Sequence, residues 1–166
     1  MEARVYAVLV WLEDSALGAV LRDAGVWTYA WLNLLHILGI AALFGAVLVL
    51  DLRLIGCWRR IPFAQIARPT VPLAGMGLAA AVLSGGMMIT VNATGYDGNP
   101  FLYVKLPLVV LGILNVAVIA RLPAWRRALA GQADASADRW MLRTAGASSL
   151  AIWLGVIVCG RMIGYW

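Results

Sequence analysis

Apolar residues along the chain gather in four long runs, separated by short polar or arginine-rich segments. The runs cover residues 26–50, 71–91, 101–120 and 145–163. Each is close to the roughly 20 helical residues that cross a hydrocarbon core of about 30 Å. None of them alternates with the two-residue period of a barrel strand. The pattern predicts an all-α integral membrane protein, with a four-transmembrane-helix bundle over residues 25–166.

The segment 1–24 has a different pattern. Its apolar run is only eight residues long and is closed by Glu13 and Asp14, so it is too short to span a membrane. Asp14 or Ser15 is placed to cap a second helical stretch, and Gly25 is placed to stop it. We predict that this segment forms one or two amphipathic helices at the membrane surface.

Composition and charge agree with this class and add an orientation. Hydrophobic residues make up 63% of the chain and charged residues 13%, with a mean hydropathy of +0.88; a soluble domain of this size could not hide so much apolar surface. Nine of the thirteen basic residues follow the first and third runs, and the positive-inside rule places them in the cytoplasm. The sequence therefore predicts a multi-pass protein of a bacterial inner membrane with both termini outside. The net charge of +5 reflects this topology and contact with anionic lipids of the bilayer, not nucleic-acid binding.

Polar residues inside the first run are the first candidates for function. His36, the only histidine, lies ten residues below the start of the run, about 15 Å deep. An imidazole at that depth usually ligates a metal or haem, or relays protons. Asn33 precedes it by three residues and is placed to hold one ring nitrogen. We expect Asp51 and Arg53 to end this helix on the cytoplasmic side.

The third run carries a second polar set. Lys105, Gly112 and Asn115 are spaced by seven and three residues, which places them on one helical stripe. Lys105 lies about 6 Å below the outer boundary, and Arg161 enters the fourth run at a similar height. We expect His36, Lys105 and Asn115 to face one interior cavity open to the outside, since a depth difference of about 9 Å suits an extended ligand. The alternatives are snorkelling for Lys105 and Arg161 and a helix–helix hydrogen bond for Asn115.

Three motifs together resemble an uncharacterised bacterial family of four-helix membrane proteins: "LLHILGIAALFGAVLVLDLRLIG", "GNPFLYVKLPLVVLGILN" and the terminal "GRMIGYW". The layout of His36, Arg53 and Lys105 is also distantly similar to HemJ-type protoporphyrinogen oxidases and to copper-resistance D-type membrane proteins. The HemJ resemblance implies haem binding in which the histidine and the lysine are functional. The sequence departs from that family where "DLRLIG" continues to Cys57 without a second histidine, so enzymatic activity stays an open question.

Three functions follow from these residues. The first is a haem-binding or redox-associated protein in which His36 is an axial ligand of a b-type haem and Lys105 and Arg161 neutralise the propionates. The iron would then be five-coordinate, take a methionine or lysine, or be shared across a homodimer. The second is copper handling through His36, Met87 and Met88, although both methionines also suit plain core packing.

The third function is a non-catalytic subunit that binds a partner in a membrane complex. Catalytic groups are scarce in this chain. It has no Ser/His/Asp set, phosphate-binding loop or zinc motif, which argues against hydrolytic and nucleotide-driven chemistry.

Overall fold

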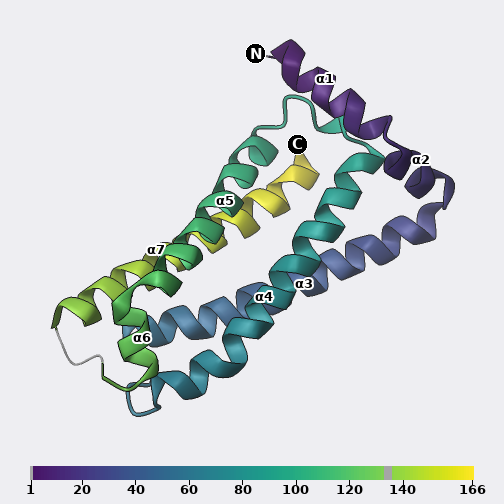
Figure 1. Ribbon diagram of the computed structural model, residues 1–166. Helices are drawn as coiled ribbons and strands as arrows, with labels where there is room; N and C mark the ends of the chain where they lie inside the picture. The colour runs from purple at the N-terminus through teal and green to yellow at the C-terminus, as the bar shows by residue number, and fades with distance from the viewer. Residues whose placement is uncertain (1, 133–135) are drawn as a thin grey trace. The chain divides into compact units, whose positions relative to one another are not determined.

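The computed structural model describes residues 2–132 and 136–166, and all regular structure within them is helical. Figure 1 shows the helices in chain order. They are α1 (Glu2–Glu13), α2 (Ala16–Asp23), α3 (Val26–Ile55), α4 (Phe63–Val91), α5 (Pro100–Arg121), α6 (Pro123–Leu129) and α7 (Ser136–Met162), with short 3₁₀ turns η1 (Thr94–Tyr96) and η2 (Ile163–Tyr165). Four helices, α3, α4, α5 and α7 continued through η2, are long and apolar enough to cross a membrane. The prediction of an all-helical fold with four such helices is confirmed.

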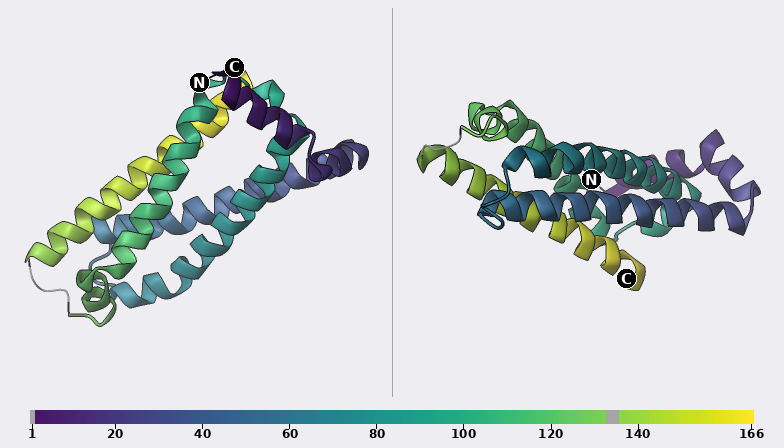
Figure 2. Two further views of the ribbon diagram at one scale, coloured as in Figure 1. Left: turned by 45° about the horizontal axis from the view of Figure 1, so that its top comes forward. Right: turned by 90° about the horizontal axis from the view of Figure 1, so that it is seen from below.

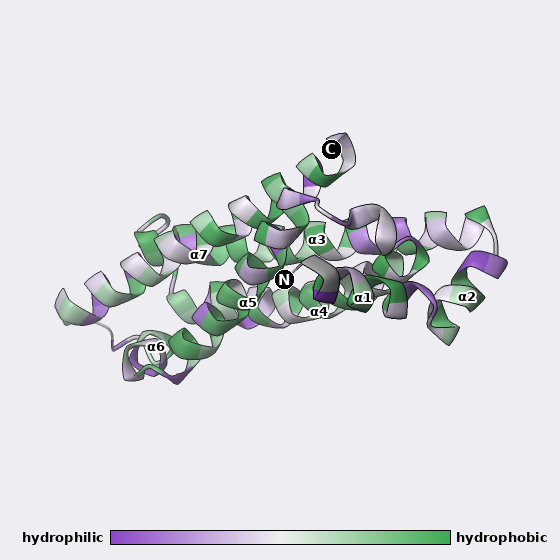
Figure 3. Ribbon diagram, turned by 90° about the horizontal axis from the view of Figure 1, so that it is seen from above, coloured by the Kyte–Doolittle hydropathy of each residue, from purple (hydrophilic) through white to green (hydrophobic). Residues whose placement is uncertain are grey.

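The long helices expose most of their apolar surface. Only 17 to 28% of the most apolar window of each candidate span is buried. Large side chains such as Leu38, Val110 and Leu114 are more than half exposed. Figure 3 shows long helices that are mostly hydrophobic, with hydrophilic residues visible near α2 and α6. Exposed apolar surface on this scale is unfavourable in water and favourable against lipid chains.

The chain forms two compact units. The first unit contains α1, α2, the part of α3 up to Leu43, the part of α4 from Gly75 and η1. The second unit contains the remainder of α3 and α4 together with α5, α6, α7 and η2.

Glycines bring α3 and α4 into backbone contact within the first unit. A Cβ atom placed on Gly77 would overlap the backbone nitrogen of Leu43, and one placed on Gly39 would lie 2.7 Å from that of Ala81. Only a residue without a side chain fits at these two positions. Such contacts between small residues are a common basis of helix association in lipid.

The N-terminal segment forms two helices, as its sequence predicts. Ser15 caps α2, because its side-chain oxygen accepts a hydrogen bond from the backbone N–H of Gly18 at 3.1 Å. The chain then turns at Gly25, whose φ of +82° favours glycine. The location of these helices at a membrane surface stays a prediction.

The two N-terminal helices are tied to the end of α4 and to η1, which follows it. The Thr94 N–H donates to Oε2 of Glu13 at 2.7 Å, and this bond holds the pKa of Glu13 below its usual value of 4.5. Arg22 donates from Nη1 to the carbonyl oxygens of Glu13 and Thr90, at 2.8 and 3.3 Å.

In the second unit, α5 and α7 run side by side (Figure 2, left). Gly112 of α5 lies beneath Trp153 of α7: a Cβ atom on the glycine would be 2.8 Å from the ring atom Cζ2. An ion pair between Arg127 and Asp138, 2.6 Å from Nε to Oδ2, joins α6 to α7. The apolar core of this unit consists of Leu54, Phe63, Ala67, Ile119, Ala124, Ala128 and Leu142.

The end of the first span differs from the sequence prediction. We expected Asp51 and Arg53 to end the helix, but α3 continues through both to Ile55. The helix stops at Gly56, which has a φ of +125°. A charged side chain does not interrupt helical hydrogen bonding, whereas a left-handed residue does.

The second and fourth helices also begin earlier than their apolar runs. The second begins at Phe63 rather than at residue 71, and it contains Pro69 and Pro72. Each proline lacks an N–H group to donate within the helix, which is why the sequence favoured a later start. The fourth begins at Ser136 rather than at residue 145, because its first turns are polar.

Candidate functional site

The imidazole of His36 is held by the backbone of α4. The ring is half-buried, and Nδ1 lies 2.8 Å from the carbonyl oxygen of Ala81 and 3.2 Å from Oγ of Ser84. A carbonyl oxygen only accepts hydrogen bonds, so the short contact assigns the proton to Nδ1. The other ring nitrogen, Nε2, then carries the lone pair.

A glycine makes this arrangement possible. A Cβ atom placed on Gly85 would lie 2.7 Å from Cε1 of His36 and 3.1 Å from Nδ1, whereas one placed on Gly86 would meet nothing within 4 Å. The ring therefore packs directly on the helix backbone at Gly85.

The partners that the structure gives Nδ1 lie on α4. The expectation that Asn33 holds one ring nitrogen stays a prediction. Asn33 is half-buried one turn earlier on α3.

The two methionines predicted as metal ligands are half-buried in the same unit. Met88 follows Ser84 by four residues and Ala81 by seven, so it lies on the face of α4 that contacts His36. Met87 lies about 100° further round the helix. Within residues 2–132 and 136–166, no group of three or more His, Cys, Asp or Glu side chains could hold a metal ion.

The predicted stripe on α5 faces α7. The Nζ atom of Lys105 lies 3.2 Å from the Cβ position of Gly160. The amide of Asn115 donates to the carbonyl oxygen of Ala145 over a long distance of 3.5 Å. Together with Gly112, these residues form the α5–α7 contact of the second unit, which matches the helix–helix role considered for Asn115. A shared cavity with His36, which belongs to the first unit, stays a prediction.

The two arginines predicted at the cofactor site have other partners. Arg161 is exposed, hydrogen bonds to the hydroxyl of Tyr165, and has its guanidinium carbon 4.5 Å from the centre of that ring. Arg53 donates from Nε and Nη2 to the carbonyl oxygen of Ile61, at 3.2 and 3.0 Å. Both arginines lie in the second unit.

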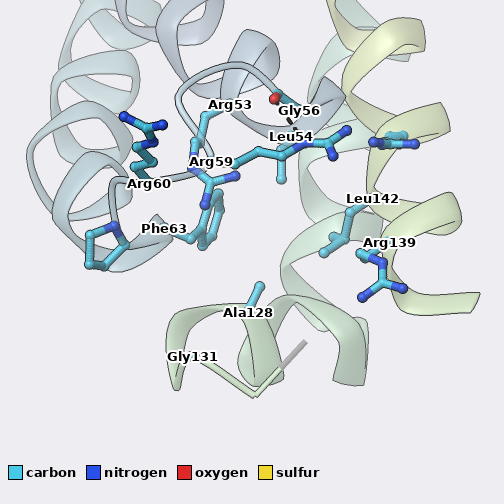
Figure 4. A pocket seen from close by; sticks show the side chains of 12 residues that line it. Arg53, Leu54, Gly56, Arg59, Arg60, Phe63, Ala128, Gly131, Arg139 and Leu142 are labelled. Carbon is cyan, nitrogen blue, oxygen red and sulfur yellow. Dashed lines mark hydrogen bonds between the residues drawn. The ribbon is translucent and has the colours of Figure 1, made fainter. Parts of the chain in front are cut away.

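Arg53 also lines a pocket of about 870 Å³ in the second unit. We call it the arginine pocket, because five of its lining residues are arginines: Arg53, Arg59, Arg60, Arg139 and Arg143. Figure 4 labels four of these arginines, Arg53, Arg59, Arg60 and Arg139, together with Leu54, Phe63 and Leu142 of the same lining. Sequence reasoning treated Arg59, Arg60, Arg139 and Arg143 as a topology signal and as contacts with anionic lipids, and it did not bring them together.

A buried polar group on α3 and α7 was also missed. Asp51 and Ser149 are 3% and 2% exposed, and the Ser149 side chain is a hydrogen-bonding neighbour of the Asp51 carboxyl group. Oδ2 of Asp51 and Nε1 of Trp153 are buried without a hydrogen-bond partner among the described residues. The spacing of Gly146, Ser149 and Trp153 on α7 was the available signal, since it marks one buried helix face.

Comparison with known proteins gives a family but no activity. No curated protein and no solved structure matches the chain, so the similarity to HemJ-type oxidases and copper-resistance D-type proteins stays a prediction. A family model described as a family of unknown function, DUF6644, matches residues 8–166. The match spans the second half of α1 and every later helix. The chain belongs to DUF6644, a family of unknown function.

Proposed function

We propose that this chain is a multi-pass protein of a bacterial inner membrane that binds a redox cofactor at His36. Four helices of suitable length and hydropathy support the membrane location. The arginines after the first and third spans support an orientation with both termini outside.

The observation that carries the cofactor proposal is the hydrogen bond from Nδ1 of His36 to Ala81. Histidines that ligate metals almost always donate their other ring N–H to a carbonyl or carboxylate, which fixes the tautomer and orients the ring. Here the donation leaves the lone pair on Nε2, the atom that would bind a metal.

The cofactor favoured by this arrangement is a b-type haem with His36 as one axial ligand. Met88 is a suitable second ligand, since it shares the face of α4 that contacts His36. A five-coordinate iron or a haem shared across a homodimer are the other arrangements. Bound haem would supply one-electron redox chemistry, and this chain would hold and orient it.

The variant His36→Asn tests the haem proposal. The asparagine amide keeps a donor near the position of Nδ1 and removes Nε2, so the contact with Ala81 is retained while the ligand is lost. We expect wild-type protein purified in detergent, after expression with haem precursors, to show a Soret band that His36→Asn lacks. A matched control is Leu35→Ala, which changes an exposed side chain of the same helix and leaves the imidazole in place. A Soret band of equal intensity in His36→Asn, or no band in wild-type protein, rules out this ligand.

Copper is the second candidate, favoured by the position of Met88 on the face that contacts His36. Imidazole and thioether are both suitable ligands for Cu(I). We expect protein from copper-supplemented cells to retain copper after chelator-free purification, and both His36→Asn and the double variant Met87→Ala/Met88→Ala to lose it. Copper content that is unchanged in these variants argues against the site. Absence of both haem and copper favours a non-catalytic subunit of a membrane complex.

A further inference from the structure

The arginine pocket carries positive charge that is not balanced within its own lining. Of its twelve described lining residues, five are arginine and none is Asp or Glu. The described acidic residues of the second unit are Asp51 and Asp138. Asp51 is buried beside Ser149, and Asp138 is bound by two nitrogens of Arg127, at 2.6 and 2.7 Å.

Two of the guanidinium groups approach one another at Gly56. Nη2 of Arg59 and Nη2 of Arg143 lie 3.0 and 3.3 Å from the point where a Cβ atom on Gly56 would stand. The two Nη2 atoms can therefore be no further apart than the sum of these two distances. Arg59 donates from Nε to the Gly56 carbonyl oxygen at 3.1 Å, which fixes its orientation. Because like charges repel at this range, the pair is suited to an anion that accepts from both groups.

We infer that the arginine pocket binds a phosphate-bearing anion through Arg59 and Arg143. Guanidinium groups match phosphate oxygens with paired N–H donors. The connection between α3 and α4 is held by Arg53, which donates twice to Ile61, so the pocket is formed before the anion arrives. This inference does not depend on the function proposed for His36.

The shape of the pocket favours a lipid headgroup as the source of the phosphate. Its volume of about 870 Å³ lies in the range of sites for small organic ligands. Its apolar lining includes Leu54, Leu142 and Phe63, and Phe63 is braced edge-on by Trp125 with ring centres 5.1 Å apart. Basic pockets on the cytoplasmic side of transmembrane helices are suited to phospholipid headgroups, and this end of the chain is predicted to face the cytoplasm.

The test uses the full chain in a neutral detergent, titrated with phosphatidylglycerol and, in a separate arm, with inorganic phosphate. Bound lipid is counted by native mass spectrometry, and phosphate binding is measured by calorimetry. The test variant is Arg59→Gln/Arg143→Gln. The matched control is Arg121→Gln/Arg126→Gln, which removes two exposed arginines outside the pocket lining.

We expect the test variant to bind phosphatidylglycerol at least about tenfold more weakly than wild-type protein, since each charged hydrogen bond contributes strongly. We expect the control to change by less than about twofold, because its two arginines do not line the pocket. Arg59→Lys/Arg143→Lys keeps the charge, removes the paired donors, and is expected to be intermediate. Circular dichroism and unfolding temperature establish that each variant is folded.

The two arms separate the sources of the anion. Arginine-dependent binding of phosphatidylglycerol but not of inorganic phosphate supports a lipid headgroup. Arginine-dependent binding in both arms supports a phosphate site that free phosphate also occupies. Equal losses in the test and control variants, or no binding in either arm, overturn the inference.

Discussion

Single glycines decide where the polar groups of this chain can lie. Gly85 lets the His36 ring pack on the backbone of α4, and Gly56 lets Arg59 and Arg143 approach a single point. At each position a side chain would occupy space that a functional group now fills. Packing therefore requires glycine at both positions. Gly56 also has a positive φ, a backbone conformation that favours glycine.

Neighbouring glycines on α4 provide a direct test at this scale. Gly85→Ala places a methyl group 2.7 Å from Cε1 of His36, so we expect it to displace the ring and lower stability by about 1–3 kcal/mol. Gly86→Ala meets nothing within 4 Å and is expected to stabilise α4 by up to about 1 kcal/mol. Thermal unfolding in detergent measures both. Equal unfolding temperatures for the two variants would show that the ring does not pack on Gly85.

Short helices are positioned by a few hydrogen bonds, whereas the long ones are positioned by extended packing. The α1–α2 pair is joined to the end of α4 and to η1 by Glu13 and Arg22. In contrast, α5 and α7 contact each other along their length, with Gly112 beneath Trp153. The attachment of α1 and α2 uses charged side chains, and the part of it that depends on the Glu13 carboxylate therefore depends on pH.

The attachment of α1 to η1 is expected to weaken in acid. The Glu13 carboxylate accepts from Thr94, and its pKa is lowered by that bond. Its contribution is thus fully present above the unfolded value of 4.5 and is lost as pH falls through the lower folded value. We expect the exchange protection factor of the Thr94 amide to fall several-fold between neutral pH and acid below the folded pKa.

Glu13→Gln should remove that pH dependence, because glutamine does not titrate and accepts more weakly. Asp23→Asn is the control, since Asp23 is exposed at the end of α2. A protection factor that depends on pH equally in Glu13→Gln and in wild-type protein contradicts this account.

For the whole molecule, the distribution of arginines predicts the orientation in the membrane. Arg59 and Arg60 follow the first candidate span, and Arg126 and Arg127 follow the third. The connection after the second span contains Asp97 and no arginine. The positive-inside rule concerns short loops of this kind, so both connections rich in arginine should lie in the cytoplasm.

Cysteine labelling tests this orientation with a residue that the chain already has. Cys57 is exposed beside the arginine-rich connection, and Cys159 is half-buried. In Cys159→Ala, we expect a membrane-impermeant maleimide to label Cys57 in inverted vesicles and not in spheroplasts. Asp97→Cys in a chain without the native cysteines should label in the opposite pattern. Labelling of Cys57 from the outside would reverse the topology.

The sequence by itself determined the number of long helices, and it narrowed the N-terminal segment to one or two helices with a cap at Asp14 or Ser15. These features depend on residues close together in the chain: a run of apolar side chains is long enough to span or it is not, and a cap joins residues three apart. The stripe of Lys105, Gly112 and Asn115 was predictable for the same reason. The helical repeat alone places these three residues on one face.

Only the tertiary structure decided which groups meet across helices. It pairs His36 with Ala81 of α4, and it buries Asp51 beside Ser149 where the sequence suggested the cytoplasmic end of the helix. It also gathers arginines from the end of α3, from the α3–α4 connection and from α7 into one pocket. Such contacts depend on the rotation and register of helices distant in sequence. The rotation and register depend on where glycines allow two helices to approach closely. A pattern within one segment of the sequence does not predict which helices meet there.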